Sequence, residues 1–428
     1  MRREKRQDLK LEFEIFSQTN GMSFDNDAKS CYDRIVMNLA LLASQKLGMP
    51  AVICQWYQKF LNHASYHIQL PKMTSETNYS HTPDNPLHGP GQGSRAAPSL
   101  WVIVSSLIMK CMEDKAPGMT FQDPTGTHTS HHIMTGFVDD TTHWVNDFQA
   151  ALKGNYSKQD LYDDTYVTAQ WWEQLLSATG GKLELPKCFY YTITWQFTEE
   201  GVPFLPTTKD ENYDIQILSS DANIPVSIEE KTPHESHKTL GVMENPSGKY
   251  DDEYRYLQQK SQTWRESINN QHLTRQEIQL FYQSFYLPSI RYHLTINTFT
   301  RDQLEKIQHP VVQTILQRMG YNSNMPKDVI YGDTTAGGLG YTHLFAMQGQ
   351  QKLKLIFQAY RSLTPHTTIT HITLQWAQHL SGLTYSIFEH PEIPIPQLSD
   401  NNTTQISHSS QSTTSHSQDH SLEHPTQQ

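Results

Sequence analysis

The chain has 428 residues, of which 44 are acidic and 33 are basic, and its formal net charge is −11. This length exceeds one ordinary domain and predicts two or three folded units. The acidic excess excludes a protein that is basic over its whole surface, so nucleic acid would have to bind at local basic clusters. The clearest such cluster in the sequence is residues 2–6.

The cysteines exclude a recognisable zinc site or disulfide framework, because they lie far apart and form no CxxC pair. They are Cys31, Cys54, Cys111 and Cys188. The N-terminus is charged, and the longest apolar run, residues 100–109, is too short for a membrane span. These features predict an intracellular protein that is neither secreted nor membrane-spanning, and they do not distinguish nucleus from cytoplasm or set an oligomeric state.

In the first part of the chain, residues 23–26 read as the end of a short strand, so Asp27 lies at a strand-to-helix junction. Apolar residues at helical spacing then predict a helix that Gly48 and Pro50 stop. A second helical run, residues 52–61, precedes a polar stretch, residues 74–88, that we expect to be a loop.

A glycine-rich turn at residues 89–94 leads to Pro98, which is expected at the first position of a buried helix. Two apolar runs flank Asp139 and Asp140 and predict a hairpin with the two aspartates at its tip. Ser157 is then placed to cap a further helix, and the aromatic and β-branched residues 188–198 predict a strand.

After residue 248 the pattern becomes helical. One helix carries Ile278 and Phe285 and is expected to end at Pro288, and another begins at Thr300, which has capping-box spacing to Gln303.

The adjacent carboxylates at residues 139 and 140 suit phosphoryl chemistry. Joining nucleotides requires two metal ions, which activate the attacking 3′-hydroxyl and neutralise the triphosphate, and carboxylate oxygens are suitable ligands. Asp27 offers a third carboxylate from the earlier strand. Five residues later, Tyr32 is placed to pack under the sugar of a nucleotide, where its ring would clash with a 2′-hydroxyl and favour deoxynucleotides.

Taken together, these residues resemble the catalytic palm of a reverse transcriptase, closest to those of non-long-terminal-repeat retrotransposons. Blocks similar to five of the family's motifs occur in the family's order, at residues 26–33, 92–98, 137–140, 181–188 and 238–242. Residues 337–340 also resemble a glycine-leucine segment that follows the thumb. The joint order is more specific than any one motif.

The resemblance implies a role for each matching residue. Asp27, Asp139 and Asp140 would hold two Mg²⁺ ions, with Mn²⁺ as a substitute, Tyr32 would select the sugar, Gln92 and Gly93 would line the nucleotide pocket, Lys187 would protonate pyrophosphate, and Leu240 and Gly241 would grip the primer. The implied partners are an RNA template, a DNA primer and deoxynucleoside triphosphates.

The implied fold class is α+β, a right-hand polymerase with a small antiparallel palm sheet and an all-helical thumb. Residues 1–20 would be a remnant of the fingers or a linker, 21–248 the palm with a finger insertion, 249–392 the helical thumb and connection, and 393–428 a disordered tail poor in apolar residues.

The chain departs from the family in two places. The finger segments that normally precede the first aspartate block, with basic residues that contact the triphosphate, are missing, and Ala97 stands where many relatives carry serine. An alternative is therefore a truncated, inactive fragment of a retroelement that binds nucleic acid or protein. A third hypothesis is a metal-dependent nuclease that uses the same carboxylates.

Several of these residues also have a purely structural interpretation. Tyr32 can be a core aromatic, Gln92 can brace its turn and Lys187 can be a solvated surface lysine. We interpret His128, His131 and His132 as part of a solvated polar loop, since no cysteine or carboxylate is spaced to complete a metal site. Residues 337–340 lack dinucleotide-binding spacing and are expected to form a structural turn.

Overall fold

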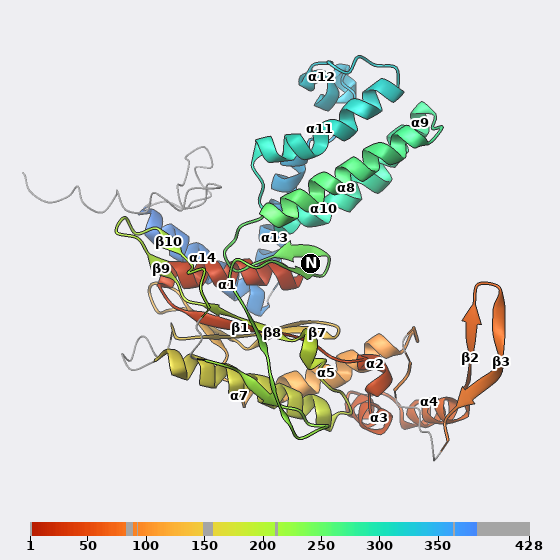
Figure 1. Ribbon diagram of the computed structural model, residues 1–428, viewed down its shortest axis with the longest axis vertical. Helices are drawn as coiled ribbons and strands as arrows, with labels where there is room; N and C mark the ends of the chain where they lie inside the picture. The colour runs from red at the N-terminus through yellow and green to blue at the C-terminus, as the bar shows by residue number, and fades with distance from the viewer. Residues whose placement is uncertain are drawn as a thin grey trace, which may run out of the picture.

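The computed structural model describes residues 2–82, 89–91, 93–148, 157–209, 213–362 and 364–382. The chain forms a mixed α and β structure with one five-stranded sheet, several two-stranded sheets and many helices (Figure 1). The predicted α+β class is therefore confirmed. In this described part of the chain, no helix has the length and apolar character needed to cross a bilayer.

The five-stranded sheet has β1 at its centre, in the order β13-β8-β1-β7-β6. Its strands are β1 (Gly21–Asp27), β6 (Met134–Phe137), β7 (Asp140–Asn146), β8 (Phe189–Ile193) and β13 (Glu229–Lys231). β1 pairs antiparallel with β7 and β8, and β13 is parallel to β8. The strands predicted before Asp27, around the Asp139–Asp140 hairpin and after Cys188 are all present.

Two helices, α5 (Ala97–Glu113) and α7 (Lys158–Ala178), cover one face of this sheet (Figure 1). Alternate residues of β1 bury their side chains against them, and Met22 and Phe24 are almost fully buried there. Pro98 lies in the first turn of α5, and Ser157 caps α7 in a capping box with Asp160. The predicted cap at Ser157 is confirmed, and α5 begins at Ala97, one residue before the start predicted at Pro98.

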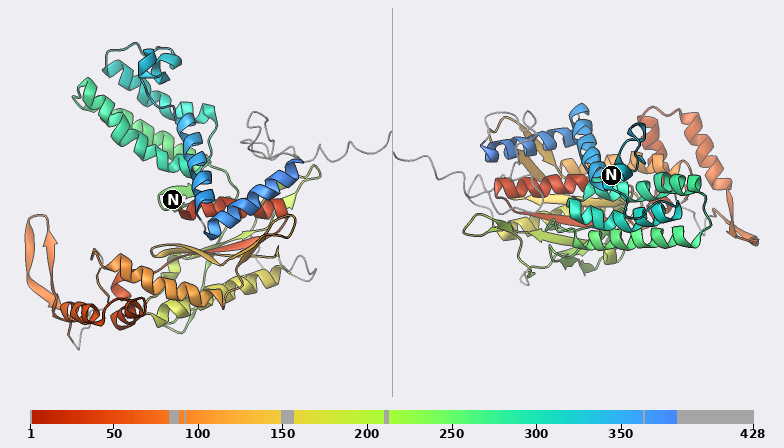
Figure 2. Two further views of the ribbon diagram at one scale, coloured as in Figure 1. Left: turned by 180° about the vertical axis from the view of Figure 1, so that it is seen from behind. Right: turned by 90° about the horizontal axis from the view of Figure 1, so that it is seen from above.

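The opposite face carries α1 (Arg2–Ser17) and α14 (Pro365–Ser381), which pack side by side (Figures 1 and 2). Phe13 of α1 and Ile372 of α14 join Trp144 and Tyr191 of the sheet in one core. The first residues, expected to be a linker or finger remnant, thus include a packed helix. The last described helix, expected in the helical thumb and connection region, covers the sheet, and its apolar face is buried there.

Between β1 and α5 the chain forms an insertion that extends away from the sheet (Figure 1). It consists of α2 (Cys31–Arg34), α3 (Met37–Lys46), α4 (Ala51–His63) and a hairpin of β2 (Ser65–Leu70) and β3 (Met73–Ser80). The expected loop at residues 74–88 is wrong over β3, because backbone pairing with β2 compensates for its polar sequence. The expected single helix is broken at Val36, whose N–H bonds to the Thr179 carbonyl instead.

The histidines expected in a loop are placed differently. β4 (Met119–Gln122) pairs with β5 (Thr129–His132), so His131 and His132 lie on a strand. His131 contacts the Thr120 hydroxyl across this pair, and His128 contacts Asp123. This pairing, set by contacts between strands, corrects the loop prediction. The histidines form no metal-binding group in the part of the chain that the structure describes.

Short strands connect the sheet to the rest of the chain. They form three two-stranded sheets from β9 (Gln196–Phe197) and β10 (Pro203–Phe204), β11 (Gln216–Leu218) and β12 (Pro225–Ser227), and β14 (His237–Thr239) and β15 (Val242–Glu244). The β14–β15 hairpin leads directly into the helices that follow.

The remaining helices form a unit with its own apolar core. They are α8 (Asp251–Asn270), α9 (Arg275–Phe281), α10 (Leu287–Ile296), α11 (Arg301–Arg318), α12 (Lys327–Tyr331) and α13 (Leu344–Arg361). Thr300 caps α11 with Gln303 as predicted. Pro288, expected to end a helix, lies in the first turn of α10, because a π-helical turn at Tyr282–Tyr286 accommodates the ring within a continuous helical path. The predicted tail, residues 393–428, lies outside the described residues.

Candidate active site

Two carboxylates face each other where β1 ends. Asp27 and Asp140 are direct partners in the antiparallel pairing of β1 with β7. The Ala28 N–H donates to the Asp139 carbonyl at 3.2 Å, so the Asp27–Asp140 pair lies at a non-hydrogen-bonded position. Facing side chains are closest at such positions, with Cα atoms about 4.5 Å apart, and like charges there are destabilising. The site therefore concentrates negative charge.

A tight turn presents the third carboxylate. Phe137 pairs with Asp140, which leaves only Val138 and Asp139 in the turn between β6 and β7. Val138 has a φ of 59°, a left-handed conformation that is strained for a β-branched residue and costs about 1–3 kcal/mol. The buried indole of Trp101 on α5 donates to the Val138 carbonyl at 2.5 Å. α5 thus holds the strained turn in place.

We expect Trp101→Phe, which keeps an aromatic side chain but removes the indole N–H, to destabilise the fold by about 1–2 kcal/mol because the Val138 carbonyl loses its partner. If the indole positions the turn, the turnover number of any reaction at Asp139 should also fall. The matched control is Trp376→Phe, because the Trp376 indole donates to the Gln122 carbonyl at 2.8 Å. Thermal unfolding should show similar losses of stability in the two variants, whereas only Trp101→Phe should lower the turnover number. Equal turnover numbers in both variants would contradict a positioning role for Trp101.

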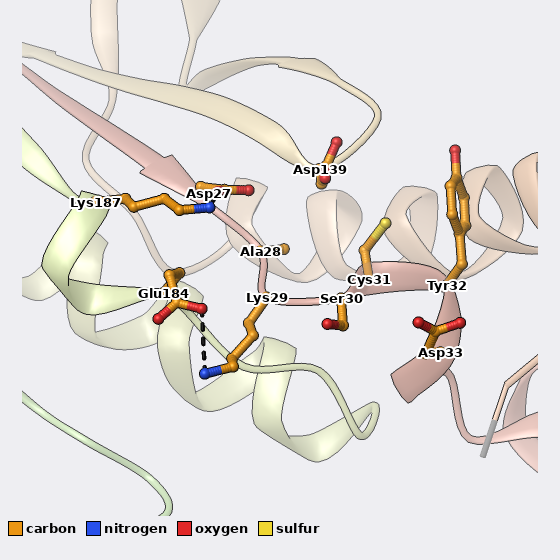
Figure 3. Close-up of a pocket in the computed structure, with 10 residues that line it drawn as sticks. All are labelled: Asp27, Ala28, Lys29, Ser30, Cys31, Tyr32, Asp33, Asp139, Glu184 and Lys187. Carbon is orange, nitrogen blue, oxygen red and sulfur yellow. Dashed lines mark hydrogen bonds and ion pairs between the residues drawn. The ribbon is translucent and has the colours of Figure 1, made fainter. Parts of the chain in front are cut away.

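Lys187 supplies the nearest positive charge. It ends a 3-10 turn, η1 (Leu185–Lys187), that is fixed next to β1 by a bond from the Glu184 N–H to the Asp27 carbonyl. Its ammonium donates to Asp27 Oδ2 at 2.7 Å (Figure 3). This hydrogen bond and the charge of Asp27 raise the pKa of Lys187. The two residues, 160 positions apart, are thus brought into direct contact.

A cavity of about 240 Å³ opens beside these groups. Its lining residues, drawn in Figure 3, are Asp27, Ala28, Lys29, Ser30, Cys31, Tyr32, Asp33, Asp139, Glu184 and Lys187. Tyr32 is half-buried, and its ring points to the same side as the Asp139 carboxylate. Burial raises the pKa of Asp139, the nearby charge of Asp27 raises it further, and Lys187 opposes the shift.

Among the other expected residues that the structure describes, Asp140, Gly93, Leu240 and Gly241 do not line this cavity. Gln92 lies outside the described residues, and Gly93 lies in the turn before α5 with a φ of 92°. Leu240 and Gly241 form the β14–β15 turn with φ values of 48° and 98°. Residues 337–340 form a turn after α12, as expected.

The sequence interpretation missed two groups at the site. Glu184 forms an ion pair with Lys29 at 3.2 Å, which ties the η1 segment to the chain after β1 (Figure 3). Trp101 was treated only as part of an apolar helix. Glu184 lies within the matched block at residues 181–188, which could have drawn attention to it, whereas no spacing rule indicates the Trp101 contact.

The donor set at this site fits magnesium. Mg²⁺ prefers hard oxygen ligands, keeps several waters and needs few carboxylates. Asp27, Asp139 and Asp140 offer only carboxylate oxygens, while burial raises the pKa of the neighbouring Cys31 thiol to about 12 and keeps it protonated. Among the described residues, no three His, Cys, Asp or Glu side chains are gathered as a ready-made metal-binding group.

No protein-family model matches the chain, and no curated protein matches it. Similar solved structures include telomerase from Candida albicans in complex with a TWJ fragment of telomeric RNA, with 12% identity over 86% of this chain and 52% of that chain and a TM-score of 0.25. Another is apo telomerase from Candida tropicalis, with 11% identity over 87% of this chain and 55% of that chain and a TM-score of 0.26. This chain spans about half the length of those chains. TM-scores of this size do not establish a shared fold.

Proposed function

We propose that the chain is an RNA-directed DNA polymerase of a non-long-terminal-repeat retrotransposon. The observation that carries the proposal is the direct cross-strand pairing of Asp27 with Asp140, next to Asp139 in a two-residue turn. The ordered sequence blocks, two of which contain these residues, also support it.

In this proposal the five-stranded sheet with α5 and α7 is the palm, and the helical unit from α8 to α13 is the thumb. The thumb would hold an A-form-like hybrid of RNA and DNA through its backbone and shape. The turn of Leu240 and Gly241 joins the two parts, because β15 leads into α8, and it would contact the primer end.

Each residue of the site has a proposed task. Asp27, Asp139 and Asp140 would hold two Mg²⁺ ions, or Mn²⁺ in their place. When bound, these ions lower the pKa of the 3′-hydroxyl and neutralise the charge of the triphosphate. Lys187 carries a proton next to Asp27 and would donate it to the departing pyrophosphate. Gln92 and Gly93 would contact the incoming nucleotide.

A primer-extension assay tests the proposal. Purified chain, a primed homopolymer RNA template, Mg²⁺ and a labelled complementary deoxynucleotide should give extended primers. If the folded chain binds the template but gives no extension, the proposal fails and the inactive binding fragment is favoured. Cleavage of unprimed RNA in the same buffer would instead indicate a nuclease.

We expect Tyr32→Ala to weaken selection of the sugar. Removing the ring removes the group that would clash with a 2′-hydroxyl, so incorporation of ribonucleotides relative to deoxynucleotides should rise by about tenfold or more. Tyr32→Phe keeps the ring and should leave this ratio unchanged. Ratios of kcat/KM for the two nucleotides measure the effect, and an unchanged ratio in Tyr32→Ala would make Tyr32 a packing residue only.

A further inference from the structure

The insertion between β1 and α5 exposes an unusual number of aromatic side chains. We define the aromatic surface as Trp56, Tyr57 and Phe60 of α4 together with Tyr66 and Tyr79 of the β2–β3 hairpin. Trp56 is 64% exposed, Phe60 55% and Tyr79 49%. Large rings rarely stay this exposed in groups, and contiguous apolar patches mark binding sites.

The rings of this surface stack on one another. Trp56 and Phe60, one helical turn apart, have ring centroids 5.9 Å apart and planes inclined by 16°. Tyr57 stacks on Phe60 at 6.3 Å, and Tyr66 stacks on Tyr79 across the hairpin at 5.2 Å. Only Ala64 separates the end of α4 from the start of β2, so the two stacks belong to consecutive elements of the insertion. The aromatic surface therefore consists of one stack on α4 and one on the hairpin that follows it.

Positive charge accompanies these rings. The insertion from α2 to β3, residues 31–80, contains four basic residues, Arg34, Lys46, Lys59 and Lys72, and two acidic ones, Asp33 and Glu76. This contrasts with the net charge of −11 for the whole chain. Lys59 is exposed on the same stripe of α4 as Trp56 and Phe60. A partner with negative charge and flat apolar groups would complement both features.

The position of the surface also suits a long, thin partner. The hairpin projects away from the sheet, beyond the C-terminal end of β1 (Figures 1 and 2). The helical unit extends toward the same side of the molecule. α4 follows α2 and α3, which directly follow Asp27. A strand that reaches the candidate active site could therefore continue along α4.

We propose that the aromatic surface binds single-stranded nucleic acid, with bases stacked on Trp56, Phe60 and Tyr79 and phosphates near Lys59 and Lys72. Single-strand binding proteins combine exposed rings with positive charge in this way, because every base has a face that can stack. The proposal rests on the surface itself, so it holds whether or not the chain extends primers.

Fluorescence anisotropy of the full chain with labelled 12-nucleotide oligo(U) and oligo(dT) tests the proposal. Each ring removed in Trp56→Ala and Phe60→Ala should weaken binding by about fivefold or more. Lys59→Gln should reduce the slope of log affinity against log salt by about 0.7. Equal losses for both oligonucleotides indicate a surface that does not distinguish RNA from DNA, and a loss for oligo(U) alone assigns it to RNA.

The matched control is Phe204→Ala, because Phe204 is 42% exposed on β10 at the opposite end of the molecule (Figure 1). It should bind both oligonucleotides as the unaltered chain does. Asp139→Asn should also bind normally while losing primer extension, which separates this proposal from the polymerase proposal. Unchanged oligonucleotide binding by the folded Trp56→Ala and Phe60→Ala variants would overturn the proposal, and a shift from dimer to monomer in light scattering would then make the surface an interface between copies.

Discussion

Asp139→Asn is expected to lower the turnover number for deoxynucleotide addition by about a thousandfold, which corresponds to about 4 kcal/mol of lost transition-state stabilisation. Asparagine keeps the size of the side chain but cannot supply the negative charge that a divalent ion requires. Asp139 lies in the two-residue turn beside the Asp27–Asp140 pair, so its replacement removes one of the three carboxylates at the end of β1. Single-turnover extension of a primed RNA template measures the loss.

The same substitution should not destabilise the fold. Burial raises the pKa of Asp139, so folding disfavours its charged form, and the charge of Asp27 adds to this effect. A neutral asparagine removes that repulsion, and the melting temperature at pH 7 should therefore stay the same or rise. Loss of turnover together with an unchanged or higher melting temperature identifies a functional role.

Asp163→Asn is the matched control, because Asp163 is an exposed aspartate on α7 that accepts a bond from Gln159 one helical turn away. Its turnover and melting temperature should match those of the unaltered chain. Turnover of Asp139→Asn within twofold of this control would contradict the assignment of Asp139 to the reaction.

Local patterns made the centre of the site predictable from sequence. The apolar runs around Asp139 and Asp140 predicted a hairpin, and the pattern before Asp27 predicted a strand end. Both elements formed as expected, because each depends on neighbours in the chain. The register that places Asp27 opposite Asp140 follows from strand pairing, in which one slipped residue would turn every side chain to the other face.

Contacts between distant segments were not predictable. The Lys187 ammonium meets Asp27 only because a bond from the Glu184 N–H fixes η1 beside β1. Similarly, the spacing of Phe13 and Ile372 shows that their helices have apolar faces but does not reveal that both cover one side of the sheet. The polar β3 strand formed through pairing with β2, which overrides the composition of a single segment.

Three elements are joined by one buried polar network behind the β14–β15 turn. The fully buried Glu253 of α8 accepts a bond from His293 Nδ1 at 2.5 Å and another from the Met243 N–H at 2.9 Å. Lys260 lies 3.1 Å from His293 Nε2, so the ring accepts there and donates from Nδ1 to Glu253. The network connects β15, α8 and α10. It thus fixes the turn of Leu240 and Gly241 to the helical unit.

We expect Glu253→Ala to lower the free energy of unfolding by about 3–5 kcal/mol, because it leaves the buried His293 and the Met243 N–H without their acceptor. Urea denaturation measures the loss.

Glu266→Ala on the exposed side of the same helix is the matched control, and its free energy of unfolding should stay within about 0.5 kcal/mol of that of the unaltered chain. If the β14–β15 turn grips a primer, Glu253→Ala should raise the KM for primer more than it lowers the turnover number, when both are measured under conditions in which the variant stays folded. The substitution removes the anchor of the turn but leaves the carboxylates of the site in place. An unfolding free energy within 1 kcal/mol of the Glu266→Ala control would show that Glu253 does not hold the two units together.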